Sequence, residues 1–201
     1  MFSDSRLLLK LWLKNPMKIG TVAPSSPELA SAMARHIPPA AKGGGDGYVV
    51  ELGGGTGPVT RAILDAGVPM DRLVVVERDP TLHRHLVERY PGVRVLLGDA
   101  MHLQQLLRRE GVTPVRAVVS GLPLLVMKKA IQHRIGAQIF AVLEPDAPMI
   151  QFTYGLFSPL KNRRRLGVSG GVKDRVLQNL PPASVWLYRK GHGSERNARA
   201  A

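Results

Sequence analysis

The residues with the clearest chemical potential stand at positions 49–58, VVELGGGTGP, where an apolar run meets a turn made mostly of glycine. Glycine at positions 53, 55 and 57 permits positive φ angles and lets backbone amides approach a ligand that a Cβ atom would keep away. Pro58 suits the first position of a helix. The turn lacks the Lys-Ser/Thr pair of a triphosphate-binding loop, so ATP chemistry is not expected. The segment therefore predicts a nucleotide-binding turn between a strand and a helix.

Acidic residues stand at the ends of three successive apolar runs. Glu51 lies near the end of the first run, Glu77 ends the run at 73–77, and Asp99 follows the third. The carboxyl ends of neighbouring parallel strands share one crevice, which is the usual ligand position. Glu77 stands where a carboxylate accepts hydrogen bonds from both hydroxyls of a ribose. Three acids make the crevice negative, which disfavours a pyrophosphate and favours a cationic ligand such as S-adenosylmethionine.

The elements that must position these residues alternate along the chain between short β-branched runs and longer helical patterns. Strands are predicted at 48–52, 73–77, 93–97, 115–119 and 147–153, and helices near 58–66, 81–90, 101–110 and 126–143. This alternation is typical of a doubly wound α/β fold with a mostly parallel sheet. Two further strands at 172–178 and 184–190, joined through Leu180-Pro181-Pro182-Ala183, predict a C-terminal antiparallel hairpin at the sheet edge.

The length of 201 residues predicts one domain, residues 1–201. Helical patterns at 3–14 and 27–37 indicate an N-terminal helical region over 1–45, followed by the core at 48–190 and a polar tail at 191–201. The chain has no cysteine, which excludes disulfides, thiolate metal sites and a cysteine nucleophile. The histidines show no spacing suited to a metal site, so no metal is expected.

The charge balance points to a polyanionic partner. The chain has 28 Lys and Arg against 15 Asp and Glu, a net charge of +13, which fits nucleic acid or an anionic membrane. Arg6, Lys10 and Lys14 recur on one face of the first helical pattern, and Trp12 with five leucines fills the rest. This pattern predicts a membrane-binding helix in the headgroup plane; the alternative is a helix that simply covers the sheet with its apolar side, and a lid would be compatible with both. No segment fits a bilayer span or a secretory signal, so a cytoplasmic, peripheral membrane location is expected.

Four segments in order, VVELGGGTG, VVVERD, LLGDA and VVSGLP, resemble the class I S-adenosylmethionine-dependent methyltransferases over about residues 48–155. The resemblance implies a Rossmann-like fold, S-adenosylmethionine as cofactor and S-adenosylhomocysteine as product. It places the 53–57 backbone at the methionine end, Glu77 on the ribose, and Asp99 on the adenine amino group. The implied cofactor-binding set is Glu51, Gly53, Gly55, Thr56, Gly57, Glu77, Arg78, Gly98, Asp99, Ala100, Met101, Ser120, Gly121 and Leu122.

The segment after the fourth strand bears on the methyl acceptor. Adenine N6-methyltransferases of ribosomal RNA and DNA carry Asn/Asp-x-Pro-aromatic there, whereas this chain has Ser120-Gly121-Leu122-Pro123-Leu124. Without the amide or acid and without the aromatic, base flipping and stacking lose their main groups. Aromatic residues make up only 5% of the chain, which leaves few stacking platforms. A nucleic-acid acceptor is therefore the alternative prediction, and a non-catalytic cofactor-binding protein is a third.

Residues 19–26, IGTVAPSS, together with SGLP and the segment QFTYG at 151–155, resemble the bacterial phospholipid N-methyltransferases. The resemblance implies stepwise methylation of phosphatidylethanolamine towards phosphatidylcholine at the inner face of the membrane, with no nucleic acid and no obligate protein partner. Tyr154 is the first candidate to contact the amine or the headgroup phosphate; the alternative is a rim tyrosine in water. The residues expected at the substrate or membrane are Arg6, Lys10, Trp12, Lys14, Ser25, Ser26, Arg163, Arg164 and Arg165. For the three arginines, the alternative is a solvated loop.

Overall fold

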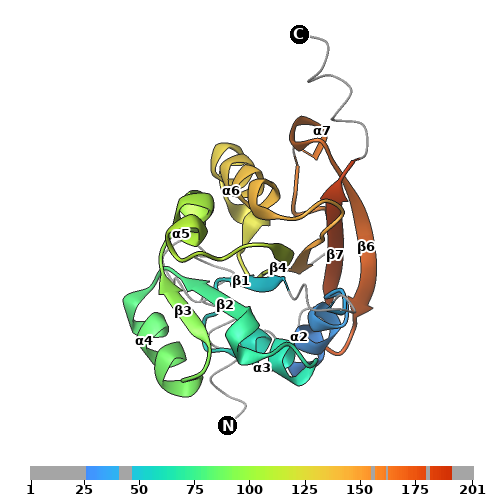
Figure 1. Cartoon of the computed structure of the whole chain (residues 1–201). Coiled ribbons are helices and arrows are strands. Elements are labelled where there is room, and N and C mark those ends of the chain that lie inside the picture. The colour runs from blue at the N-terminus through green and yellow to red at the C-terminus, as the bar shows by residue number, and fades with distance from the viewer. Residues whose placement is uncertain (1–25, 41–46, 155–156, 162, 180–181, 192–201) are drawn as a thin grey trace.

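The structure is a computed structural model that describes residues 26–40, 47–154, 157–161, 163–179 and 182–191 (Figure 1). The predicted helix at 3–14, Ser25 and the tail beyond 191 lie outside these ranges.

One seven-stranded sheet runs through the described part of the chain, in the order β3-β2-β1-β4-β5-β7-β6. The strands are β1 (Tyr48–Leu52), β2 (Leu73–Glu77), β3 (Arg94–Leu97), β4 (Val115–Ser120), β5 (Met149–Tyr154), β6 (Val168–Val176) and β7 (Ala183–Lys190). The first five pair in parallel, whereas β7 pairs antiparallel with both β5 and β6. The doubly wound, mostly parallel Rossmann-like fold and its C-terminal hairpin are confirmed.

The hairpin differs from its prediction at one end. The strand expected at 172–178 begins at Val168 and ends at Val176. Its first half contains Gly170 and Gly171 and is largely exposed, because β6 is the outermost strand. An edge strand of this kind has no buried face along most of its length, and so it shows no apolar alternation in the sequence.

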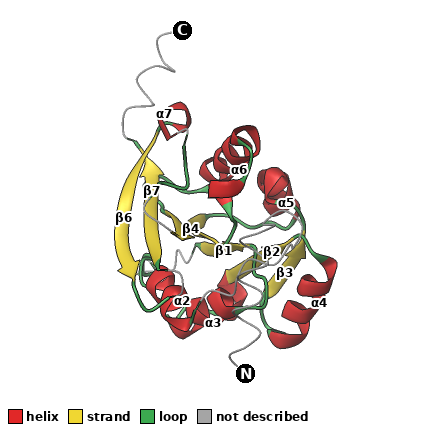
Figure 2. Ribbon diagram, turned by 180° about the vertical axis from the view of Figure 1, so that it is seen from behind, coloured by secondary structure: helices red, strands yellow, loops and turns green. Residues whose placement is uncertain are grey.

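Helices cover both faces of the sheet (Figures 1 and 2). One face carries α2 (Pro27–Ala34), α3 (Pro58–Asp65) and α4 (Pro80–Arg89), and the other carries α5 (Leu103–Arg109) and α6 (Lys129–Val142). Three of these helices begin with proline, which has no N–H to satisfy in the first turn. Ser26 and Asp79 accept backbone hydrogen bonds at the starts of α2 and α4, which satisfies amides that the helix leaves free.

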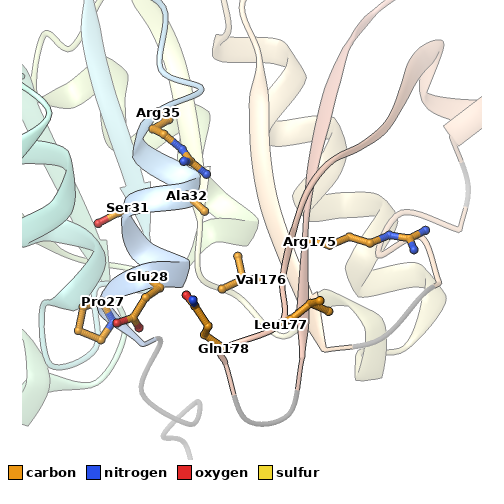
Figure 3. Close-up of a pocket in the computed structure, with 9 residues that line it drawn as sticks. All are labelled: Pro27, Glu28, Ser31, Ala32, Arg35, Arg175, Val176, Leu177 and Gln178. Carbon is orange, nitrogen blue, oxygen red and sulfur yellow. The ribbon is translucent and has the colours of Figure 1, made fainter.

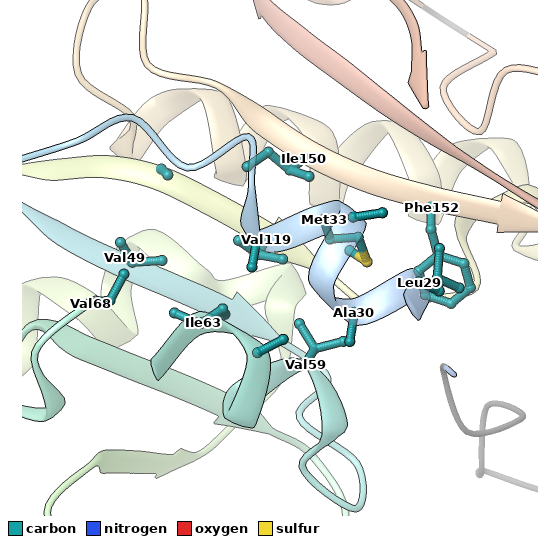
Figure 4. Packing of buried hydrophobic residues seen from close by; sticks show 14 of the residues in the cluster. Leu29, Ala30, Met33, Val49, Val59, Ile63, Val68, Val119, Ile150 and Phe152 are labelled. Atoms are coloured by element: carbon teal, nitrogen blue, oxygen red, sulfur yellow. The ribbon is translucent and has the colours of Figure 1, made fainter. Parts of the chain in front are cut away.

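The α2 helix seals one of the two hydrophobic cores. Leu29 and Met33 are fully buried in a cluster that includes Ile63 of α3 and Phe152 of β5 (Figure 4). Each such side chain contributes about 1.5–3 kcal/mol of favourable burial. The α2 helix, which precedes the first strand, is therefore part of the core.

The sheet order places a topological switch between β1 and β4. The chain winds outward through β1, β2 and β3, and then crosses to the other side of β1 to form β4 and β5. The carboxyl ends of β1 and β4 meet at this switch, which is where doubly wound folds bind their ligands.

Candidate active site

The glycine turn joins β1 to α3 at the switch point. Gly53, Gly55 and Gly57 have φ angles of 75°, 57° and 91°, and the Gly57 amide donates to the Gly54 carbonyl at 2.9 Å. A Cβ atom on Gly57 would lie 2.7 Å from the Tyr90 ring, whereas one on Gly55 meets no described atom within 4 Å. Gly57 is thus required by packing, and Gly55 faces open space at the tip of the turn.

Glu77 at the end of β2 holds the turn in place. One carboxylate oxygen accepts the Gly55 amide at 3.0 Å, and the other accepts the amides of Arg78 and Asp79 at 2.7 and 2.9 Å. Glu77 is largely buried, whereas Thr56 and the Arg78 side chain are exposed. Arg78 therefore contributes to this network through its backbone.

Glu51 lies beneath the turn rather than at its surface. Its side chain is fully buried and accepts a 2.6 Å hydrogen bond from the Thr60 hydroxyl, while Oε1 has no partner among the described residues. The pKa of Glu51 is raised to about 7, chiefly by burial and to a smaller extent by the nearby Glu77. Glu51 thus carries only part of a negative charge at neutral pH, so Glu77 and Asp99 supply most of the expected negative potential.

Asp99 follows β3 and caps the 3₁₀ turn η2 (Ala100–His102). Its carboxylate accepts the Met101 amide at 2.8 Å. Gly98, Asp99 and Met101 are half-buried and Ala100 is buried. The Gly98 amide donates to the Glu77 carbonyl at 2.9 Å, which brings the ends of β2 and β3 together.

The Ser120–Leu122 segment forms the other wall of the switch point. The Gly121 amide donates to the Leu52 carbonyl at 2.8 Å, and a Cβ on Gly121 would lie 2.9 Å from the Gly53 carbonyl oxygen. Ser120 is fully buried, and its hydroxyl accepts the Leu122 amide at 3.4 Å. The structure therefore brings the predicted segments of all four strands to one edge of the sheet.

This arrangement fits a cationic nucleoside. The turn offers open space at Gly55, a carboxylate at the tip of β2, and a buried acid with an unpaired oxygen beneath. It offers no cation for a polyphosphate at the turn itself, where the residues from 53 to 57 are glycine and threonine.

Tyr154, the last residue of β5, does not stand in water as a rim tyrosine. It is half-buried against the α2 side of the sheet, its ring 5.3 Å from that of Phe152 in an edge-to-face contact. Burial raises the pKa of Tyr154 to about 12, and its side chain hydrogen-bonds with Asn179. Asn179 also accepts the Ser26 amide at 3.3 Å. Tyr154 therefore stays protonated at neutral pH and links β5 to the start of α2.

Three buried polar residues were not predicted from the sequence as part of the site: Gln132, Gln151 and Thr153. Gln151 of β5 donates to the carbonyls of Leu122 and Phe152, and its Oε1 has no partner among the described residues. Both of its partners are acceptors, which fixes the orientation of the amide. Gln132 is described below, and the Thr153 hydroxyl is buried without a described partner. For Gln151 and Thr153, the signal in the sequence was their alternation with apolar residues in the strand MIQFTY.

The expected substrate and membrane residues are only partly described. Arg163, Arg164 and Arg165 lie in the short helix α7 (Arg163–Leu166) rather than in a loop, and all three are exposed. Arg163 donates to the Gly170 carbonyl at 3.0 Å. Ser26 caps α2. The remaining residues of this group, Arg6, Lys10, Trp12, Lys14 and Ser25, lie outside the described residues.

Neither of two cavities is lined by residues of the glycine turn. One of about 620 Å³ lies between α2 and the end of β6, with Glu28, Arg35 and Arg175 on its rim (Figure 3). None of the predicted site residues lines it. Another, of about 510 Å³, is lined by Leu125, Phe157, Ser158, Leu160, Lys161 and Arg163.

Within the described ranges, no three acidic, histidine or cysteine residues gather as a metal site. In the same part of the chain, no helix has the length and apolar character to span a bilayer.

Solved structures of other proteins share this fold. A TehB-like S-adenosylmethionine-dependent methyltransferase from Corynebacterium glutamicum matches with a TM-score of 0.59 over 94% of this chain and 99% of that chain, at 14% identity. An O-methyltransferase from Bacillus cereus, solved with S-adenosylhomocysteine, matches with a TM-score of 0.58 over 95% and 92%, at 13% identity. At such low identities, these matches concern the fold alone.

No protein-family model matches the chain, but whole proteins do. The ornithine lipid N-methyltransferase of Singulisphaera acidiphila is 37% identical over 194 residues, which cover 92% of this chain and 96% of that protein. The ribosomal RNA small subunit methyltransferase A of Sinorhizobium fredii is 33% identical over 162 residues, which cover 68% of this chain and 48% of that protein.

The fold, the acidic strand tips and these relatives define a class I S-adenosylmethionine-dependent methyltransferase, with S-adenosylmethionine as the methyl donor. Within that class, the chain belongs to the family of bacterial lipid N-methyltransferases that includes the Singulisphaera enzyme. The resemblance found in the sequence is thereby confirmed.

Proposed function

We propose that this protein transfers methyl groups from S-adenosylmethionine to the amine of a membrane lipid headgroup. The observation that carries the proposal is the 37% identity with an ornithine lipid N-methyltransferase along nearly the whole of both chains. Phosphatidylethanolamine is the acceptor that the sequence motifs favour, and an ornithine lipid is the acceptor that the relative favours. Both lipids join an amine to an acidic group in one headgroup.

The donor site uses the residues at the four strand tips. The Glu77 carboxylate accepts the ribose hydroxyls in place of the Gly55 amide, which frees that amide for the ligand. Asp99 contacts the adenine amino group, and Ala100 and Met101 lie against the ring. The open face of Gly55 receives the methionine part, with Glu51 beneath it. Gly121 and Leu122 close the crevice from the side of β4.

The chemical step is an in-line displacement at carbon. Bound S-adenosylmethionine supplies an electrophilic methyl group on a sulfonium. The unprotonated amine forms the new N–C bond as the S–C bond breaks, so the sulfur leaves as a neutral thioether and the amine proton goes to solvent. The protein therefore contributes orientation and exclusion of water. With its pKa raised to about 12, Tyr154 is a hydrogen-bond donor to the headgroup rather than a base.

The chain works as one methyltransferase domain whose N-terminal region reaches the membrane. Residues 1–14 carry the cationic, leucine-rich pattern, and the net charge of +13 favours the anionic inner face of a bacterial membrane. The exposed arginines of α7 add to this attraction, because no carboxylate pairs with them within the described ranges.

The deciding experiment offers radiolabelled S-adenosylmethionine with three acceptors in parallel: phosphatidylethanolamine vesicles, ornithine lipid vesicles and ribosomal RNA. Label in either lipid supports the proposal and identifies the acceptor. Label in RNA alone contradicts it and favours the kind of activity named for the Sinorhizobium relative. Binding of the donor without label in any acceptor indicates a non-catalytic protein.

A further inference from the structure

The cavity beside α6 combines apolar walls with two cations. Leu125, Phe157 and Leu160 supply apolar surface, and Lys161 and Arg163 supply charge, around a volume of about 510 Å³. Phe157 is 77% exposed. Exposed aromatic surface in a concave site is typical of a contact with an apolar partner, because burying that surface is favourable by a few kcal/mol.

A buried glutamine fixes the two sides of this cavity relative to each other. Gln132 of α6 is 1% exposed. Its amide nitrogen donates to the Leu124 carbonyl and its amide oxygen accepts the Lys161 amide, both at 3.0 Å. The first bond holds the β4–α6 turn, next to Leu125, and the second holds the segment that follows β5. Both walls are therefore preorganised before any ligand binds.

A second polar contact, between Ser158 and Tyr188, connects the cavity lining to the sheet. The Ser158 hydroxyl donates to the Leu160 carbonyl at 3.1 Å and lies 2.8 Å from the Tyr188 hydroxyl. Since Ser158 has one hydroxyl hydrogen, the Tyr188 hydroxyl is the donor to Ser158. Tyr188 is fully buried on β7, so this contact ties the cavity to the sheet.

The charge of the cavity is uncompensated. Lys161 and Arg163 are exposed, and within the described part of the chain no carboxylate lies within ion-pair distance of either. One guanidinium nitrogen of Arg163 binds the Gly170 carbonyl, which orients the group and leaves its other donors for a ligand. Two cations in the lining of a partly apolar cavity complement an anion on an apolar stem.

The cavity also adjoins the donor crevice along the chain. Leu122, whose side chain approaches Gly53, is three residues before Leu125 in the same turn. Leu125 follows the carboxyl end of β4 and Phe157 follows that of β5, so the cavity and the donor crevice lie at the same end of the sheet.

We propose that this cavity binds the acidic group of the acceptor lipid, phosphate or carboxylate, between Lys161 and Arg163, with the apolar stem of that lipid against Phe157 and Leu125. The inference rests on the proposed lipid acceptor. In this arrangement the cavity selects lipids whose headgroup has an acidic group at a fixed distance from the amine.

The test compares two double substitutions of equal charge. Lys161→Gln/Arg163→Gln removes the two cations of the cavity, and Arg108→Gln/Arg109→Gln removes two exposed cations from the far end of α5. Methyl transfer is measured in nonionic detergent micelles that contain phosphatidylethanolamine, or ornithine lipid if that is what the unmodified protein labels. We expect the cavity variant to raise the KM for lipid roughly tenfold, equivalent to about 1.4 kcal/mol of binding, and the α5 variant to leave it within about twofold. Calorimetry should give the same affinity for S-adenosylmethionine in all three proteins.

A second pair of variants tests the apolar wall. Phe157→Ser should also raise the KM for lipid without changing donor affinity, whereas Met70→Ser, an exposed residue before β2, should not. Equal KM values for the cavity and α5 variants in a protein that labels lipid would overturn the inference alone. Absence of lipid labelling by the unmodified protein would instead defeat the proposed function.

Discussion

At the scale of single residues, Glu51 makes stability depend on pH. Its pKa is raised from 4.5 to about 7 in the folded protein, chiefly by burial. Between these values the folded carboxyl keeps a proton that the unfolded chain releases, so raising the pH favours unfolding. Stability is fully present below about pH 4.5 and falls until about pH 7. The loss is on the order of 3 kcal/mol.

We therefore expect Glu51→Gln to gain stability relative to the unmodified protein as the pH rises from 4.5 to 8. Thermal denaturation at both pH values measures this difference. Glu88→Gln, at an exposed position of α4, is the control and should give the same shift at both pH values. A Glu51→Gln effect that does not change with pH would show that the carboxyl is ionised in the folded protein throughout this range.

Thr153 allows a substitution that removes one buried hydroxyl and little else. Its Oγ1 has no hydrogen-bond partner within the described ranges, and the residue is 4% exposed. Thr153→Val keeps the shape and removes the unsatisfied group, so the free energy of unfolding should rise by about 1 kcal/mol. Urea denaturation measures the change. A decrease would show that the hydroxyl is satisfied, for example by an ordered water.

The acidic residues of the site could be found in the sequence because each lies at the end of an apolar run or shortly after it. Glu77 and Asp99 are of this kind, and the structure places both at the expected edge. Gln151 and Gln132 could not be assigned roles, because their partners, Leu122 and Lys161, are 29 residues away in the chain. The position of Tyr154 at the end of a strand was predictable, but its contact with Asn179 depends on the hairpin and α2 coming together.

At the scale of elements, two glycines of the turn between β1 and α3 have different roles. Packing requires Gly57, whereas Gly55 is expected to leave room for the ligand. Both Gly55→Ala and Gly57→Ala place a side chain at positive φ, which costs about 1–2 kcal/mol. At Gly57 the new methyl also meets the Tyr90 ring, which is held by its 2.8 Å hydrogen bond to the Gly57 carbonyl. Gly57→Ala should therefore be clearly the more destabilising of the two in denaturant titrations.

For binding of S-adenosylmethionine, by contrast, we expect Gly55→Ala to have the larger direct effect. The methyl group that Gly55→Ala adds meets no described atom within 4 Å, so it would occupy the space proposed for the ligand. Gly55→Ala should keep most of its stability and still lose at least about tenfold in affinity for S-adenosylmethionine by calorimetry. Unchanged affinity in a stable Gly55→Ala protein would show that the donor does not approach this turn.

Most elements could be predicted because each has a local signal. The β1 and β2 strands match their predicted ranges, since the apolar runs there are bounded by glycine or by charged residues. The start of β6 was misplaced because its residues are exposed on both faces at the sheet edge. The α7 helix was missed because four residues, three of them arginine, show no apolar period. The failures thus fall where tertiary contacts, rather than local preference, decide the structure.

At the scale of the whole molecule, charge and the N-terminal segment should act separately on membrane association. The net charge of +13 is spread along the chain, whereas residues 1–14 contain only three of its cations together with one carboxylate. Raising the salt concentration from 0.1 M to 1 M shortens the screening length from about 10 Å to about 3 Å, so attraction to anionic lipid should fall steeply. Co-sedimentation with phosphatidylcholine vesicles, with and without phosphatidylglycerol, measures it.

Removal of residues 1–14 should lower binding at every salt concentration, because the segment supplies Trp12 and most of the apolar contact proposed for the membrane. The shortened protein should nevertheless keep most of the salt dependence, since it keeps most of the net charge. Equal binding by the two proteins would remove the N-terminal segment from the membrane contact. If the shortened protein instead loses the salt dependence, the electrostatic attraction comes from residues 1–14. The remaining cations, including those of α7, would then not contribute to membrane binding.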